Sequence, residues 1–201
     1  MNPAKNTLSS LVILTFAAGV AFSQGSNDPD FDLSNTNGYF YFLLAGKNKC
    51  DRKDCEVGIT LLTKAIQLKP KQIDPYAYRA WAEYSKGDYD KAIADYTKCV
   101  ELQPDNFNPY IYRGFAKEKK GDHDGAIADF TAIIKHEHDP TELLIGAHDN
   151  RGHSKIAKGD LAGAALDFNE ILELKPSGPS ADFFISDARN EIEEIKKPVK
   201  K

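Results

Sequence analysis

The residues that could do chemistry in this chain are few and scattered. His136 and His138 stand at an expected helix end and could hold a metal ion, but the polarity of a loop explains them better. His148 and His153 are five residues apart, which is poor spacing for one helix face. The sequence contains no Ser-His-Asp order, Gly-rich phosphate loop or HExxH motif. We therefore predict no enzymatic activity, no metal site and no cofactor.

The three cysteines suggest two roles. Cys50 and Cys55 lie in a polar stretch, where a disulfide closing a short loop is expected if the protein is exported. Half of a metal site is the alternative, but no second Cys or His pair has zinc spacing. Cys99 follows Asp95 by four residues in an apolar helical pattern, which predicts a buried thiol that packs as a small hydrophobic side chain.

The elements that must position these residues come in a repeat. A segment of eleven residues that begins at Lys86 is repeated from Lys120 and again from Lys158. Its glycine therefore recurs after 34 and then 38 residues. A period in this range indicates a solenoid of stacked helix pairs. In the clearest unit, Asp74-Pro75 begins the first helix and Lys86-Gly87-Asp88 ends it, with Asp88 placed to cap the second helix.

This pattern resembles the tetratricopeptide repeat (TPR) family. The family's Ala-x3-Phe element is met by Ala92/Tyr96, Ala126/Phe130 and Ala164/Phe168, and loosely by Gly58/Leu62. Its terminal proline is met by Pro70, Pro104 and Pro176, and the glycine of its first helix by Gly46, Gly114 and Gly152. The resemblance implies an all-α fold, a right-handed α-α superhelix with about four helix pairs at 39–72, 73–106, 107–140 and 145–178. A capping helix is expected at 180–197, and the four extra residues before the fourth pair should lengthen its first helix by a turn.

One departure from the family pattern is informative. The leucine that the family places before its glycine position is replaced by Arg79, Arg113 and Arg151, and an aspartate follows each arginine after 16 residues. In an antiparallel helix pair, two residues at this offset lie at matching heights, and an unpaired buried charge is costly. We therefore predict three structural ion pairs, which are Arg79–Asp95, Arg113–Asp129 and Arg151–Asp167.

The resemblance also implies a concave groove lined by the first helix of each pair. The positions that face it in the family are occupied here by Leu43, Lys47, Ala77, Trp81, Tyr84, Ile111, Phe115, Glu118, Asp149 and His153. The centre of this set is aromatic and aliphatic, unlike the Lys, Asn and Arg set with which some family members clamp a C-terminal carboxylate. Trp81 and Phe115 have two interpretations, as binding side chains or as core.

The N-terminus has the features of an export signal. Residues 11–22 form an apolar run, and Ala21-Phe22-Ser23 offers the small residues that a signal peptidase reads. We expect a signal peptide at 1–23, a flexible leader at 24–35, and a periplasmic or secreted protein. An uncleaved membrane anchor is the alternative, although the run is shorter than the roughly 20 residues that span a bilayer.

Charge argues against a nucleic-acid partner. The chain carries 26 basic and 30 acidic residues, and loss of Lys5 with the signal peptide leaves a net charge of −5. The sequence therefore predicts an exported interaction module that binds an apolar peptide or helix of a partner protein in its groove. A structural subunit docked through its outer face is the alternative, and an enzyme built on this scaffold is a third, weaker one.

Overall fold

The computed structural model describes residues 36–51, 54–136, 142–175 and 180–197. Within these ranges the chain forms nine α-helices and no strand. The helices are α2 (Thr36–Asp51), α3 (Cys55–Leu68), α4 (Asp74–Lys86), α5 (Tyr89–Leu102), α6 (Asn108–Lys119), α7 (His123–His136), α8 (Glu142–Ala157), α9 (Leu161–Glu173) and α10 (Ala181–Lys196). The all-α repeat fold is confirmed. The signal peptide and leader predicted at 1–35 lie outside the described residues.

The chain divides into two compact units, the first of which ends at Pro75. In this first unit α2 and α3 pack against each other, and their buried side chains are Tyr39, Phe42, Leu43, Leu62 and Ala65. Lys69 lies over the Tyr39 ring at 4.9 Å from its centroid, a cation–π contact at the end of α3. The first predicted repeat is therefore a helix pair with a small aromatic and aliphatic core.

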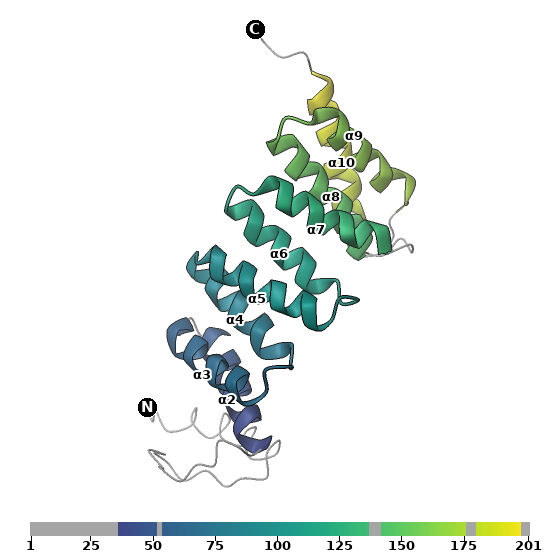
Figure 1. Ribbon diagram of the computed structural model, residues 1–201. Helices are drawn as coiled ribbons and strands as arrows, with labels where there is room; N and C mark the ends of the chain where they lie inside the picture. Colours follow the sequence, from purple (N-terminus) through teal and green to yellow (C-terminus); the bar gives the residue numbers. More distant parts are fainter. Residues whose placement is uncertain (1–35, 52–53, 137–141, 176–179, 198–201) are drawn as a thin grey trace, which may run out of the picture. The chain divides into compact units, whose positions relative to one another are not determined.

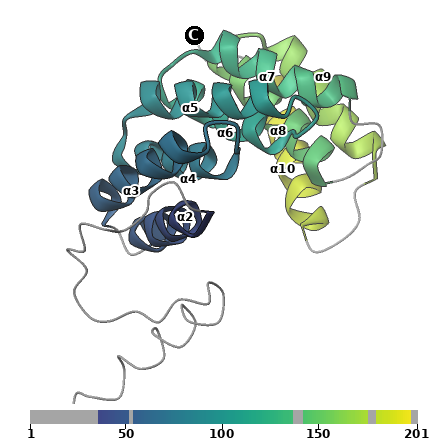
Figure 2. The same cartoon turned by 60° about the horizontal axis from the view of Figure 1, so that its bottom comes forward.

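The second unit runs from Tyr76 to Lys201 and contains most of α4 together with α5 to α10. From α5 to α10 each helix packs against the next, and α8 also contacts α10. Figure 2 shows α5, α7 and α9 along one side of this unit and α4, α6, α8 and α10 along the other. We call the second side the A-helix face, because it consists of the first helix of each pair and of α10.

A short turn joins the two helices of each pair in the second unit (Figure 1), and the three turns share one backbone conformation. Gly87, Gly121 and Gly159 have φ values of 86°, 82° and 82°, a left-handed conformation that glycine adopts without steric cost. The amide of Asp88 donates to the Glu83 carbonyl at 2.9 Å and the amide of Gly87 to the Tyr84 carbonyl at 3.0 Å. This pair of bonds is a Schellman motif, which satisfies the last carbonyls of the first helix.

The residue after this glycine caps the second helix in two of the three pairs. Asp122 and Asp160 each accept a hydrogen bond at 2.9 Å from the amide three residues later, that of Gly125 or Gly163. The prediction that Asp88 does the same is wrong, because its carboxylate instead pairs with the Lys91 ammonium at 3.0 Å. In this pair the residue three positions after the aspartate is Lys91, and its ion pair with Asp88 takes the place of the hydrogen bond that would cap the helix.

The two helices of a pair approach closely where the first helix has a glycine. A Cβ atom built on Gly114 would lie 2.7 Å from Cζ of Phe130, and one built on Gly152 would lie 2.8 Å from Cζ of Phe168. Both rings are fully buried, so neither can move into solvent. The glycine and the aromatic residue of the repeat pattern are therefore two halves of one packing contact between α6 and α7, or between α8 and α9.

The last helix covers the end of the second unit. Ala188 and Ile192 of α10 are buried in a cluster with Ile145, Phe168 and Ile171, and Phe184 and Ile195 pack beside it. These four α10 residues are the apolar stripe expected of a capping helix. None of the helices that the structure describes is both long and apolar enough to cross a membrane.

Candidate interaction face and its acidic end

The structure brings together all three predicted Arg–Asp pairs. Arg79 Nε lies 2.7 Å from Asp95 Oδ2, Arg113 Nη2 lies 2.6 Å from Asp129 Oδ1, and Arg151 Nη2 lies 2.5 Å from Asp167 Oδ1. Each pair joins the two helices of one repeat, and all three aspartates are buried. Arg79 and Arg113 each use two nitrogens on the two carboxylate oxygens, the bidentate geometry that orients as well as attracts.

Two of these arginines also contact the preceding repeat. Arg113 Nη1 donates to the Thr97 hydroxyl on α5 at 3.1 Å, and Arg151 Nη1 donates to the Thr131 hydroxyl on α7 at 3.1 Å. Each guanidinium therefore contacts a helix of the previous pair as well as both helices of its own pair. This second role was absent from the sequence-based prediction, which placed each arginine within a single repeat.

A second cation stands beside two of the aspartates. Lys117 Nζ lies 2.8 Å from Asp129, and Lys155 Nζ lies 2.7 Å from Asp167. In the second repeat the equivalent position is Glu83, which is buried 3.8 Å from the Lys91 ammonium, and burial raises its pKa. Lys117 and Lys155 thus complete charge clusters inside the helix pairs, and they are not available to a ligand.

Asp167 has the most partners. Besides Arg151 and Lys155, it lies 3.2 Å from Nδ1 of the buried His148. Burial would raise the pKa of Asp167, but hydrogen bonds from His148, Arg151 and Lys155 outweigh this effect and lower the pKa to about 2. Asp167 is therefore a permanently charged structural residue near neutral pH.

Aromatic side chains are exposed along α4 and α6 of the A-helix face. Trp81 is 40% exposed, and Phe115 is half-buried with its ring 6.0 Å from that of Phe130. Sequence reasoning missed Tyr112, which is 48% exposed and stacks on Tyr96 at 5.8 Å. Its position three residues before Phe115 was the available signal, because residues three apart share a helix face.

The other predicted groove residues differ in exposure. Ala77, Tyr84, Ile111 and Lys47 are half-buried. Leu43 is buried in the core of the first unit, so its prediction as an accessible lining residue is wrong. Glu118 accepts a hydrogen bond from the Ser154 hydroxyl, which links α6 to α8.

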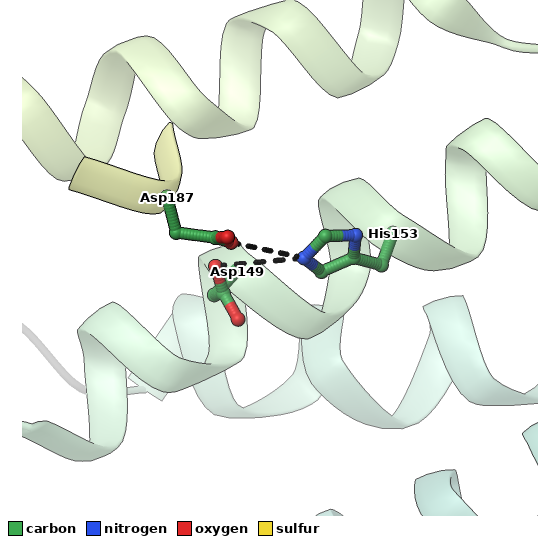
Figure 3. A group of neighbouring side chains, drawn as sticks. All are labelled: Asp149, His153 and Asp187. Carbon is green, nitrogen blue, oxygen red and sulfur yellow. Dashed lines mark hydrogen bonds and ion pairs between the residues drawn. The ribbon is translucent and has the colours of Figure 1, made fainter. Parts of the chain in front are cut away.

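Three polar side chains converge at the C-terminal end of the A-helix face (Figure 3). His153 Nε2 lies 3.2 Å from Asp187 Oδ2 and 3.8 Å from Asp149 Oδ1. Asp149 is only 8% exposed, and burial raises its pKa to about 6, against the lowering effect of His153. The nearby carboxylates of Asp187 and Glu191 add to the rise.

Asp187 was missed because α10 was interpreted only as a cap. It follows His153 by 34 residues, the period that also separates Trp81 from Phe115. Helix α10 therefore occupies the place of the first helix of a fifth repeat, and Asp187 takes the face position that His153 and Phe115 take in theirs. The period could have placed Asp187 on this face, but it could not have predicted the contact with His153.

The cysteines, His136 and His138 are the other candidate residues. The side chain of Cys50 is outside the described part of the chain, so the Cys50–Cys55 disulfide stays a prediction, and His138 is likewise not described. Cys99 is fully buried, as a small core residue would be. His136 stacks on Phe107 with ring centroids 5.9 Å apart.

Comparisons with known proteins agree with this geometry. A model described as TPR repeat matches residues 80–121, from α4 to the turn after α6. Two crystal structures of MamA are similar to the chain. The first has a TM-score of 0.62 and 16% sequence identity, and the match covers 78% of this chain and 85% of that chain. The second has a TM-score of 0.59 and 19% sequence identity, and the match covers 80% of this chain and 82% of that chain. The first TPR of Spaghetti (RPAP3), bound to the HSP90 peptide SRMEEVD, has TM-score 0.50 at 24% identity over 60% and 86%. Comparison with curated proteins finds no match. These similarities show a TPR-type fold.

Proposed function

We propose that this protein is a protein–protein interaction module whose A-helix face binds an apolar peptide or an amphipathic helix of a partner. The observation that carries this proposal is the exposure of Trp81 and Tyr112 on first helices of adjacent pairs. Tryptophan and tyrosine lose little conformational entropy when they bind and are enriched among residues that dominate binding energy. Their helices are held by the buried Arg–Asp clusters, so the face is preformed and the partner supplies most of the ordering.

The solved neighbour that carries a peptide supports the mode of binding. The RPAP3 domain is bound to an HSP90 peptide that ends in an acidic residue, so a fold of this type can accept a peptide ligand. The face of the present chain carries partly exposed carboxylates at Glu118 and Asp187, and the buried Asp149 lies beside Asp187. These groups repel an acidic peptide, and we therefore propose an apolar ligand without acidic residues.

We further infer that the protein acts outside the cytoplasm, in the periplasm or after secretion, as a binding module and without catalysis. The apolar run 11–22 and the Ala21-Phe22-Ser23 sequence at its end support this location. N-terminal sequencing of the protein from its host tests it, with Gln24 expected as the first residue. A first residue at Met1 in the exported fraction would contradict cleavage and favour an uncleaved anchor.

One observation favours the alternative of docking through the opposite face. Leu166 on α9 is 68% exposed, so the side made by α5, α7 and α9 is not uniformly charged. Elsewhere on that side, Lys98 pairs with Glu101 at 2.9 Å. If the protein were a structural subunit docked through Leu166, a substitution of Trp81 would not affect assembly.

Photo-crosslinking in the cell from position 81 tests the proposal, with position 98 as control and position 166 as the competing probe. A single protein captured from position 81 and absent at position 98 is expected. With that partner purified, Trp81→Ala should weaken binding by roughly 30-fold or more, the effect of losing a dominant interface residue, while Leu166→Ala should leave it unchanged. Capture from position 166 alone would contradict the proposal and establish the outer-face alternative.

A further inference from the structure

We propose that Asp149, His153 and Asp187 form a binding site for a divalent transition-metal ion of the zinc type. The site joins α8, which carries the first two residues, to α10, which carries the third (Figure 3). Its evidence is the arrangement of these three side chains, and it does not use the exposed aromatic residues that carry the peptide-binding proposal.

The distances fit the coordination of one ion. With donor–metal distances of about 2.1 Å, two ligands of the same ion lie about 3.0 to 3.4 Å apart. His153 Nε2 lies 3.2 Å from Asp187 Oδ2 and 3.8 Å from Asp149 Oδ1, and all three ligand atoms lie within 4.8 Å of one another. The His153–Asp187 distance matches a shared ion as it stands, and the His153–Asp149 distance requires the Asp149 carboxylate to approach by about 0.4 Å or more.

A second observation points to a missing ligand at this place. Asp149 is 8% exposed as a residue and 11% exposed as a side chain, its carboxyl group interacts with that of Asp187, and its Oδ1 has no hydrogen-bond partner within the described part of the chain. The imidazole nitrogen that it faces is 3.8 Å away, which is beyond hydrogen-bond distance. A buried carboxylate oxygen without a partner is costly, and a cation between it and His153 would remove that cost.

The donor set selects the class of ion. One imidazole nitrogen with two carboxylate oxygens suits Zn²⁺ and its neighbours among the transition metals, whereas Mg²⁺ and Ca²⁺ prefer oxygen alone. The His153 side chain is 41% exposed, so an ion can enter from solvent and keep water in its open positions. The edge of the His153 ring against Phe168, with centroids 5.3 Å apart, holds the imidazole in place.

Calorimetric titration of the full chain, without a tag and with its thiols reduced, tests this site. The wild type should show a Zn²⁺-binding event at this site. Each of the substitutions Asp149→Asn, His153→Gln and Asp187→Asn should lower the affinity of that event by at least about 100-fold. The matched control is Asp182→Asn, an exposed aspartate of the same helix α10, and it should bind like the wild type. Circular dichroism checks that each variant folds. Because the ion would tie α10 to α8, Zn²⁺ should also raise the unfolding temperature of the wild type and of the control.

Two results would overturn the proposal. The first is Zn²⁺ binding that is absent, or that is equal in the wild type and in a variant that combines the three substitutions, since the three side chains would then form only internal ion pairs. The second is equal binding of Mg²⁺, which would indicate a general acidic patch. Co²⁺ provides a measurement that needs no variant, since its visible spectrum should show nitrogen and oxygen coordination, and thiolate charge-transfer bands would place the ion at cysteines instead.

Discussion

The buried aspartates of this protein are held by more than one cation each in the third and fourth repeats. Asp129 forms ion pairs with Arg113 and Lys117. Asp167 forms ion pairs with Arg151 and Lys155 and also contacts His148. In such a cluster the desolvation of each charge is offset only while every partner is present. Substitution of a single residue in such a cluster should therefore lower the stability of the fold. The sequence pattern revealed only the Arg–Asp pair of each cluster.

Asp167→Asn should destabilise the folded protein by about 3 kcal/mol, since it leaves two cations near a buried site without their counter-charge. Chemical denaturation of the full chain measures the change in the free energy of unfolding. Glu170→Gln on the same helix removes an exposed carboxylate and should change stability by less than about 0.5 kcal/mol. Equal effects of the two substitutions would contradict a structural role for the cluster.

The same residue predicts an acid-sensitive component of stability. Its pKa is lowered in the folded state, so it stabilises the fold above the unfolded-state value near 3.8 and loses this contribution as the pH falls toward about 2. The loss should amount to about 2 kcal/mol between pH 5 and pH 2, and the difference in stability between the wild type and Asp167→Asn should shrink accordingly. A difference that is constant over this range would refute the assignment.

The helices pair closely because the first helix lacks a side chain where the second carries a large ring. Gly114 faces Phe130 and Gly152 faces Phe168, and the ring fills the space that a Cβ atom would need. In the second repeat Ala80 takes the glycine position and Tyr96 the ring position, and both are buried in one cluster. The spacing between two helices is thus set by one small residue, while propensity alone would favour alanine there.

Helix α8 offers a matched test of this conclusion, because it contains two glycines in different surroundings. Gly152→Ala should lower stability by about 1 to 3 kcal/mol, since the new methyl group meets the Phe168 ring. Gly146→Ala places its methyl group in open space and should raise stability by about 1 kcal/mol through helix propensity. Thermal unfolding of the two variants measures both signs, and stabilisation by both would show that the packing is looser than described.

In the second unit, from α5 to α10, each helix packs against the next along the array. The last helix, α10, covers an apolar end that would otherwise be exposed. Ala188 and Ile192 cover Phe168 and Ile171, and the charged side chains at the C-terminal end of α10 are exposed, at Glu193, Glu194 and Lys196. An array of this kind is stabilised by its intrinsic helix pairs and by the interfaces between neighbours. The end helix also carries Asp187, so the cap and the proposed metal site share one element.

Ile192→Asp should therefore loosen α10 and expose the end of the array. We expect a loss of about 3 kcal/mol or more, together with increased binding of a dye specific for apolar surface. Hydrogen exchange should show the largest change in α10 and α9, and little in α4 and α5, because each helix contacts mainly its neighbours. Asn190→Asp, at an exposed position of the same helix, is the control and should behave like the wild type. Exchange that rises uniformly along the second unit would contradict local coupling.

Much of this architecture could be predicted because its determinants are periodic. The recurrence of Gly87, Gly121 and Gly159 predicts the turns, and the constant offset between Arg79 and Asp95 predicts contact across an antiparallel pair. Both features depend on residues close in the chain, whose relation is set by helix geometry. Contacts between repeats were not predictable in the same way, since the bond from Arg113 to Thr97 depends on how two pairs stack.

The sequence was sufficient to determine the helix pairs, their turns and the buried charges inside them, because each is specified within one 34-residue period. Only the tertiary structure decided which side chains remain exposed and which groups meet between elements. It exposed Trp81 and Tyr112, buried Leu43, and brought Asp187 of the last helix to Asp149 and His153. The physical reason is that burial depends on neighbouring helices, and a polar cluster depends on atoms from elements whose spacing no local pattern encodes.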